Sequence, residues 1–298
     1  MSVHVISAYE RDQQTRTLTM SVNKLFRALH RQYGSFPDNY LVIDLETTGL
    51  AHESDLVGKI GHCQVVNRRP VGNAGVILNW TVRPDVDQAW LIRRLAETKY
   101  QFEHDKNGQL NGRHYQLSIE RMVAEGADPV TVLAFYLDWL FDCRRDGVVI
   151  VAHNGYNFDC PFLETAFRRF LGANWKFGNN DVFDTGMIEK ASQLQLLPWA
   201  EESIRAYSKR IYNQRAAGVY WALDSHCNQK YRLGERHGIT MASLHEPEMD
   251  ALLTHHLFEE FRRLAEESIN AQTQPASRPQ GVRQDPGQAD PFPAHPGL

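Results

Sequence analysis

The stretch LVIDLETTGL, at positions 41–50, places two acidic residues at the end of an apolar segment. Side chains alternate along a β-strand, so Asp44 and Glu46 would point to one face while Leu45 points into the core. Two carboxylates held about 7 Å apart in this way repel each other unless a cation lies between them. A lone acid here would indicate a turn cap or an arginine partner. The pair followed by Thr-Thr-Gly, a tight turn that exposes backbone N–H groups, favours a cation site.

A second group of polar residues follows an expected buried strand in VAHNGYNFDCPFL, at positions 151–163. A strand precedes a helix here, and open α/β sheets keep their ligand sites at such junctions. His153 and Asn154 would lie at the carboxyl end of the strand, although Asn154 could instead bond the backbone of the turn. Asp159 lies two residues before Pro161, so helix capping is the alternative to a functional role.

A third group, HEPEMDALL at positions 245–253, contains a histidine and an aspartate five residues apart. On one helix that spacing separates the side chains by roughly 140°, so they could not converge. Pro247 predicts that the helix begins there, which leaves His245 on the preceding loop. Asp250 would then share the inward face with Leu253, where a carboxylate is costly without a cation or a donor network. The alternative for His245 is an exposed loop histidine.

The elements that must position these residues can be predicted from periodicity and turn residues. A hairpin precedes alternating strands and helices, so we expect an α/β fold with a mixed sheet of five strands and helices on both faces. Strands are expected at 40–45, 59–67, 74–82, 147–154 and 181–185, with the second and third joined through 68–73. Helices are expected at 20–34 (between Ser21 as cap and Gly34 as end), 130–143, 161–171, 187–197, 200–215, 219–232 and 247–267.

The chain divides into three parts. Residues 38–267 hold the three polar groups and are expected to form one domain, with the stretches 92–114 and 190–216 as helical insertions. Residues 1–37 are an N-terminal extension. Residues 268–298 contain six of the thirteen prolines, and we expect a disordered tail because this composition buries too little apolar surface to fold. Docking of a protein partner by this C-terminal tail is the alternative to a plain solvated segment.

Composition restricts the class of protein. The 298 residues carry a net charge of −4, which argues against a broad basic surface and leaves room for nucleic acid only in a local cleft. The four cysteines form no C-x-x-C pair, which indicates reduced thiols and disfavours a structural zinc site. The polar N-terminal stretch, and the lack of an apolar run of roughly 20 residues, predict no signal peptide, no membrane span and a cytoplasmic location.

The three groups, in their order along the chain, resemble the three exonuclease motifs of the DEDDh family, the DnaQ-like 3′–5′ exonucleases of the RNase H-like superfamily. The resemblance covers about residues 38–267, apart from the two expected insertions. It implies an RNase H-like fold, with His245 as the general base. It also implies four metal-binding acids, which are Asp44, Glu46, Asp159 and Asp250.

The resemblance further implies a pocket for the last nucleotide. Thr47, Gly49 and Leu50 would line this pocket, and His153 and Asn154 would lie near the scissile bond. The sequence departs from the family at position 247, where the family often has alanine and this chain has proline. That departure puts the position of the preceding loop, and with it the general base, in question.

Four oxygen ligands without sulfur suit Mg²⁺ or Mn²⁺, and two such divalent cations can activate a water and stabilise a departing oxygen. We therefore expect a metal-dependent 3′–5′ exonuclease that acts on single-stranded DNA or unpaired 3′ ends and releases 5′-mononucleotides. The motifs do not separate DNA from RNA, so a 3′–5′ exoribonuclease on short RNA is the first alternative. The second is a nucleic-acid-binding or polymerase-docking module on the same fold, without turnover.

One further stretch, 201–236, contains seven Lys and Arg residues against four acids. Tyr207, Tyr212, Tyr220 and Trp221 lie within it. The stretch could follow a single strand by charge and stacking, but a solvated helix pair with core aromatics is the favoured interpretation.

Overall fold

The computed structural model of the protein describes residues 24–240 and 244–273. A five-stranded sheet lies at its centre, in the order β3-β2-β1-β4-β5. The strands are β1 (Tyr40–Thr47), β2 (Val57–Val66), β3 (Arg69–Ile77), β4 (Val149–Ala152) and β5 (Val182–Asp184). β2 is antiparallel to β1 and β3, whereas β4 is parallel to β1 and β5. This arrangement confirms the mixed five-stranded sheet predicted from the sequence.

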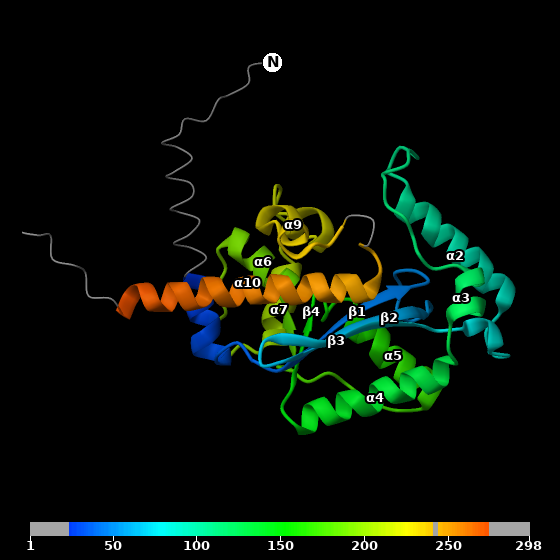
Figure 1. Ribbon diagram of the computed structural model, residues 1–298, viewed down its shortest axis with the longest axis horizontal. Coiled ribbons are helices and arrows are strands. Elements are labelled where there is room, and N and C mark those ends of the chain that lie inside the picture. Colours follow the sequence, from blue (N-terminus) through cyan, green and yellow to red (C-terminus); the bar gives the residue numbers. More distant parts are fainter. Residues whose placement is uncertain (1–23, 241–243, 274–298) are drawn as a thin grey trace, which may run out of the picture.

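Helices cover the sheet on both faces (Figure 1). α10 (Pro247–Thr273) packs along β1 and β2, while α4 (Pro129–Arg145) and α5 (Asp159–Leu171) pack together on the other side. Further helices are α2 (Gln88–Glu103), α3 (Ile119–Glu125), α6 (Thr185–Leu194), α7 (Ile204–Tyr212), α8 (Asn228–Tyr231) and α9 (Leu233–His237). No helix in the described ranges is both long and apolar enough to cross a membrane.

The hairpin between β2 and β3 differs from the prediction. Its turn consists of Asn67 and Arg68, which both have positive φ, of 49° and 67°. A two-residue turn with positive φ at both positions matches the right-handed twist of the flanking strands, so β3 begins directly after Arg68. Residues 69–73, expected in the connection, therefore belong to β3, and Pro70 is tolerated because β3 is an edge strand. Residues 80–82, expected at the end of this strand, form a 3₁₀ turn instead.

The ends of the first and last helices can also be compared with the predicted ends. Residues 24–33 are helical, and the helix ends at Gly34, as predicted, where φ is 86°. The expected cap, Ser21, lies outside the described residues. α10 continues to Thr273, six residues beyond the predicted end and into the stretch predicted as a tail. The rest of that stretch, 274–298, lies outside the described residues.

The stretch predicted as one helix over 219–232 is broken. Residues 219–222 have no regular structure, and a π-helical turn (Leu223–Cys227) and the four-residue α8 follow. Arg232, with a φ of 53°, ends α8 in the left-handed region. The prediction of a continuous helix is therefore wrong, and Tyr220 lies on a loop.

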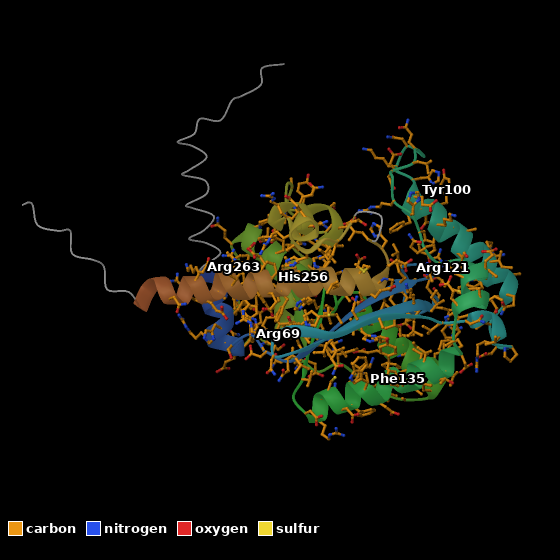
Figure 2. All side chains as sticks on the ribbon, viewed as in Figure 1. Arg69, Tyr100, Arg121, Phe135, His256 and Arg263 are labelled. Carbon is orange, nitrogen blue, oxygen red and sulfur yellow. The ribbon has the colours of Figure 1, made fainter. Side chains whose placement is uncertain are left out.

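The expected insertion 92–114 lies in α2 and the loop after it, which together with the segment to Leu117 we call the α2 arm. The arm projects away from the sheet, and Figure 2 shows Tyr100 near its outer end. The second expected insertion, 190–216, contains the end of α6 and all of α7.

Candidate active site

Two glycines, which we call the glycine row, let the start of α10 come close to β1. Asp44 pairs with Gly61 on β2, and Gly61 pairs with Gly75 on β3. A side chain at Gly61 would overlap the backbone of Pro247, and one at Gly75 would overlap the carboxylate of Glu248. Glycine within a strand often marks such an approach by another segment. The glycine row therefore brings the first turn of α10 over the strands beside Asp44.

The four predicted metal-binding acids, which we call the acid cluster, come from three elements. Asp44 and Glu46 lie on β1. Asp159 begins α5, and Asp250 lies in the first turn of α10. Burial raises the pKa of Asp44 well above its usual range, and the charges of Asp250 and Asp159 raise it further. Burial raises the pKa of Glu46 to about 8, with a contribution from Asp250, so the four acids repel one another.

Asp159 and Asp250 are the most deeply buried of the four, at 1% and 8% exposed. Burial raises the pKa of Asp250 to about 7, although the backbone N–H of His245 donates to its Oδ2 at 3.2 Å. Burial likewise raises the pKa of Asp159. Each of the two has a buried Oδ1 atom with no hydrogen-bond partner in the part of the chain that the structure describes. Such an oxygen is costly to bury, and a cation would satisfy it.

The donor set of the acid cluster fits a hard divalent cation. All four groups offer carboxylate oxygens, the ligands that Mg²⁺ and Mn²⁺ prefer. The unpaired Oδ1 atoms and the mutual repulsion also favour bound positive charge. Within residues 24–240 and 244–273, however, no three His, Cys, Asp or Glu side chains are arranged so that they could hold one ion together. The acids are gathered in one region without closing around a common point, and the metal ligands stay a prediction.

His245 lies on the loop before α10, as predicted, because that helix begins at Pro247. Its φ of 69° places the backbone in the left-handed region. The ring packs edge-to-face on Phe102, with centroids 4.9 Å apart, and its Nε2 lies 3.7 Å from Oδ2 of Asp224. Burial lowers the pKa of His245. The imidazole is therefore neutral at pH 7 and able to accept a proton.

The α2 arm supplies part of the surroundings of His245. Phe102 lies at the end of α2, and Arg113, on the loop that follows, donates to Oδ2 of Asp224 at 2.9 Å. Arg113 and Asp224 are 111 positions apart in the sequence. The contacts of this insertion could not be predicted, because no local pattern connects such distant segments.

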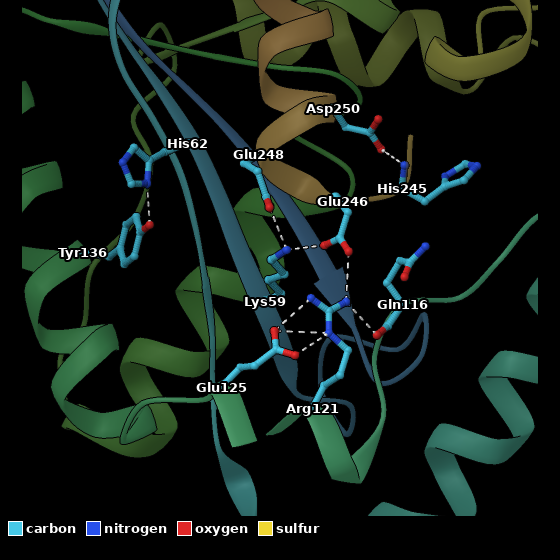
Figure 3. Close-up of polar contacts among 10 residues, drawn as sticks. All are labelled: Lys59, His62, Gln116, Arg121, Glu125, Tyr136, His245, Glu246, Glu248 and Asp250. Atoms are coloured by element: carbon cyan, nitrogen blue, oxygen red, sulfur yellow. Dashed lines mark hydrogen bonds and ion pairs between the residues drawn. The ribbon is translucent and has the colours of Figure 1, made fainter. Parts of the chain in front are cut away.

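Glu246, next to His245, is held by cations from two elements, an arrangement that we call the Glu246 brace (Figure 3). Lys59 of β2 forms an ion pair with one carboxylate oxygen, and Nη1 of Arg121, on α3, donates to the other at 2.9 Å. Lys59 is 4% exposed and lies opposite Glu46 in the register of β2 and β1. Its positive charge lowers the pKa of Glu46. The brace ties the loop of His245 to the sheet. Sequence reasoning missed it, although a lysine in a buried strand was a signal.

Some polar groups of the turn after β1 form hydrogen bonds within the turn itself. The hydroxyl of Thr47 donates to the carbonyl of Gly49. A side chain at Gly49 would overlap the ion pair between Asp55 and Arg94 of α2 and would displace it. The side chain of Leu50 is 77% exposed. The turn thus bonds within itself and leaves Leu50 open to solvent. Contact of Thr47, Gly49 and Leu50 with a nucleotide stays a prediction.

His153 and Asn154 are held by neighbouring segments. The ring nitrogens of His153 lie 3.0 Å from Oγ1 of Thr185 and 2.7 Å from the carbonyl oxygen of Trp221. The backbone N–H of Asn154, whose φ is 68°, donates to Oδ1 of the buried Asp184 at 3.0 Å. Sequence reasoning did not identify Asp184, although an acid at the end of an apolar strand is the signal that β1 also carries. Contact of the predicted pair with substrate stays a prediction.

Comparisons with known proteins give partial matches. No family model matches the chain. The chain is 27% identical over 132 residues to the DNA polymerase III PolC-type of Mycoplasma pneumoniae, covering 44% of this chain and 7% of that protein. The zinc-bound complex of E. coli exonuclease I with single-stranded DNA is similar with a TM-score of 0.47 and 13% identity, over 79% of this chain and 43% of that chain. The complex of E. coli exonuclease I with a dA16 oligonucleotide gives a TM-score of 0.45 and 13% identity, over 79% and 45%. The chain spans less than half the length of each of these proteins.

Proposed function

We propose that this chain is a metal-dependent 3′–5′ exonuclease that hydrolyses terminal phosphodiesters of single-stranded DNA or unpaired 3′ ends and releases 5′-mononucleotides. The observation that carries the proposal is the acid cluster, in which β1, α5 and α10 contribute carboxyl groups that repel one another. Such a cluster is unfavourable by itself, and bound cations that also contact a substrate phosphate would offset the repulsion between its carboxylates. The partial similarity to a DNA polymerase III of PolC type supports DNA as the substrate class.

The proposed roles follow from position and chemistry. The acid cluster would hold the cations. A pair of Mg²⁺ or Mn²⁺ ions would offset phosphate charge and lower the pKa of a bound water. His245, neutral at pH 7 because burial lowers its pKa, would accept a proton as the general base. Phe102 packs on the imidazole and restricts its orientation.

Digestion of end-labelled strands tests the proposal. A 5′-labelled DNA strand, the RNA strand of the same sequence and a DNA strand with a blocked 3′ end are each incubated with Mg²⁺, Mn²⁺ or EDTA. We expect the unblocked DNA to shorten stepwise from its 3′ end with metal, and neither EDTA nor the blocked end to permit shortening. Shortening of RNA alone would move the substrate class to short RNA. If neither polymer released a nucleotide with any cation, the proposal would be overturned in favour of a binding module.

A further inference from the structure

An open pocket lies beside the loop that precedes the π-helical turn. Residues 219–222 line it together with Ser225, His226 and Gln229, and its volume is about 400 Å³. Ligand pockets in proteins have volumes of roughly 300–1,000 Å³, so this one can hold a group as large as a nucleobase. None of the substrate-binding residues that the family resemblance implies lines this pocket.

The pocket presents an exposed aromatic ring on a fixed backbone. Tyr220 is 65% exposed, yet its backbone N–H donates to Oε1 of Gln193 at 3.1 Å and its carbonyl accepts from Nε2 of the same side chain. Gln193 is in turn held by the fully buried Glu189, which accepts from its Nε2 at 2.7 Å. An exposed loop aromatic is usually free to move, whereas this ring is attached to a segment that is already ordered. Stacking on it would cost less conformational entropy.

The segment that carries the lining residues contacts two predicted residues of the candidate active site. On one side, the carbonyl oxygen of Trp221 lies 2.7 Å from Nε2 of His153. On the other, Oδ2 of Asp224, which does not itself line the pocket, lies 3.7 Å from Nε2 of His245. A strand whose last phosphodiester lies at the acid cluster would therefore have its preceding nucleotides near this loop.

The lining favours a base over a phosphate. The seven residues around the pocket include no Lys or Arg. They offer the ring of Tyr220, the ring of His226 with its centroid 6.4 Å away, and the polar side chains of Ser225 and Gln229. Stacking on an aromatic ring tolerates any base, because every base has a π-face. A base can enter such a pocket only when it is unpaired.

We propose that this pocket binds an unpaired nucleobase of the substrate strand, upstream of the scissile phosphodiester, by stacking on Tyr220. This inference rests on the proposed function for its substrate and deepens it, because it explains why the substrate would be a single strand. Base stacking of this kind contributes about 1–3 kcal/mol per base.

Binding and turnover of matched substrates test the inference separately from the proposed function. Fluorescence anisotropy with Ca²⁺ measures the affinity of a labelled ten-residue oligothymidylate, and of the same oligomer with abasic sites upstream of its 3′ nucleotide. Tyr220→Ala is compared with Tyr220→Phe and with Phe135→Ala, which removes an aromatic ring of similar exposure, 61%, on the distant α4 (Figure 2). We expect Tyr220→Ala to weaken binding of the oligothymidylate about tenfold or more. The other two variants should bind it as the unmodified chain does, and the abasic oligomer should bind all four proteins equally.

Hydrolysis provides the second test. The p-nitrophenyl ester of thymidine 5′-monophosphate has a scissile bond and no upstream base, so Tyr220→Ala should leave its KM and kcat unchanged while raising the KM for oligothymidylate. Equal oligothymidylate affinity for Tyr220→Ala and the unmodified chain would overturn the inference. Loss of ester hydrolysis by Tyr220→Ala would also overturn it, because the residue would then act at the reacting centre. If the unmodified chain hydrolysed neither substrate, the proposed function would fail, and the anisotropy result would still decide whether the pocket binds a base.

Discussion

Asp44 is surrounded by other acids, so its charge opposes folding although the proposed chemistry requires it. Asp44→Asn keeps the shape of the side chain and removes the charge. We expect hydrolysis of 5′-labelled DNA to fall below detection, while the melting temperature in EDTA is equal to or above that of the unmodified chain because a repulsion is lost. Asp85→Asn, at an acid whose side chain is 51% exposed, is the control that should change neither. Unmodified turnover by Asp44→Asn would show that the metal assignment is wrong.

His245 makes a separate prediction, because a general base and a metal ligand fail in different ways. His245→Ala should slow hydrolysis by roughly a hundredfold or more, the usual contribution of general base catalysis. Stabilisation by Mg²⁺, measured as a rise in melting temperature, should persist since the acid cluster is intact. His114→Ala, at an exposed histidine of the α2 arm, should behave as the unmodified chain. A loss of the Mg²⁺ effect in His245→Ala would assign the histidine to metal binding instead.

At the scale of elements, the glycine row determines how closely α10 approaches β2. Gly61→Ala would force a methyl group into the backbone of Pro247, which we expect to cost about 1–3 kcal/mol of unfolding free energy and to reduce hydrolysis. Gly72→Ala, on β3, is the matched control, because its new methyl group would only reach Cβ of Gln64 at 4.0 Å. Denaturant unfolding measures both. Equal stability of the two variants would contradict the close approach of the helix.

The Glu246 brace connects β2 and α3 to the loop of the candidate base. Glu246→Gln removes the charge that Lys59 and Arg121 share, so we expect kcat to fall about 10–100-fold, as for other residues that position a catalytic group. KM should change little. Glu125→Gln is the control, because Glu125 bonds the same arginine but is 52% exposed and lies away from the loop. Equal steady-state kinetics for both variants would mean that the brace does not position His245.

The features of this site that depend on local sequence patterns were predicted, whereas those that depend on contacts between distant residues were not. The acid pair of β1 and the start of α10 follow from strand alternation and from a proline, which act within a few residues. The glycine row depends on the register of three strands, and the brace joins Lys59 to Glu246 across 187 positions, so neither could be predicted locally. The helix expected over 219–232 failed because tertiary bonds, such as those from Gln193 to Tyr220, override local propensity.

At the scale of the whole molecule, three histidines lie together where α9 packs against α10. The rings of His237 and His256 stack with centroids 3.6 Å apart, and Figure 2 shows His256 on α10. His255 is 3% exposed, and its Nδ1 lies 2.8 Å from the hydroxyl of Tyr40 on β1. Burial, together with the positive charges of His237 and Arg262, lowers the pKa of His255 to about 4. The fold therefore holds this histidine neutral.

This neutral histidine should make the stability of the whole fold depend on pH. The unfolded chain takes up a proton near pH 6.5, whereas folded His255 stays neutral to about pH 4, so its contribution is complete above pH 6.5 and is lost as the pH falls. The loss should reach about 3 kcal/mol. Raised pKa values in the acid cluster act with the opposite sign, so the measurement is the difference between the unmodified chain and His255→Asn. The amide of asparagine can still donate to the hydroxyl of Tyr40, which itself donates to Oε1 of Glu259. From denaturant unfolding between pH 7 and pH 4, we expect the unmodified chain to lose stability more steeply than the variant, and parallel curves would show that His255 is not the cause.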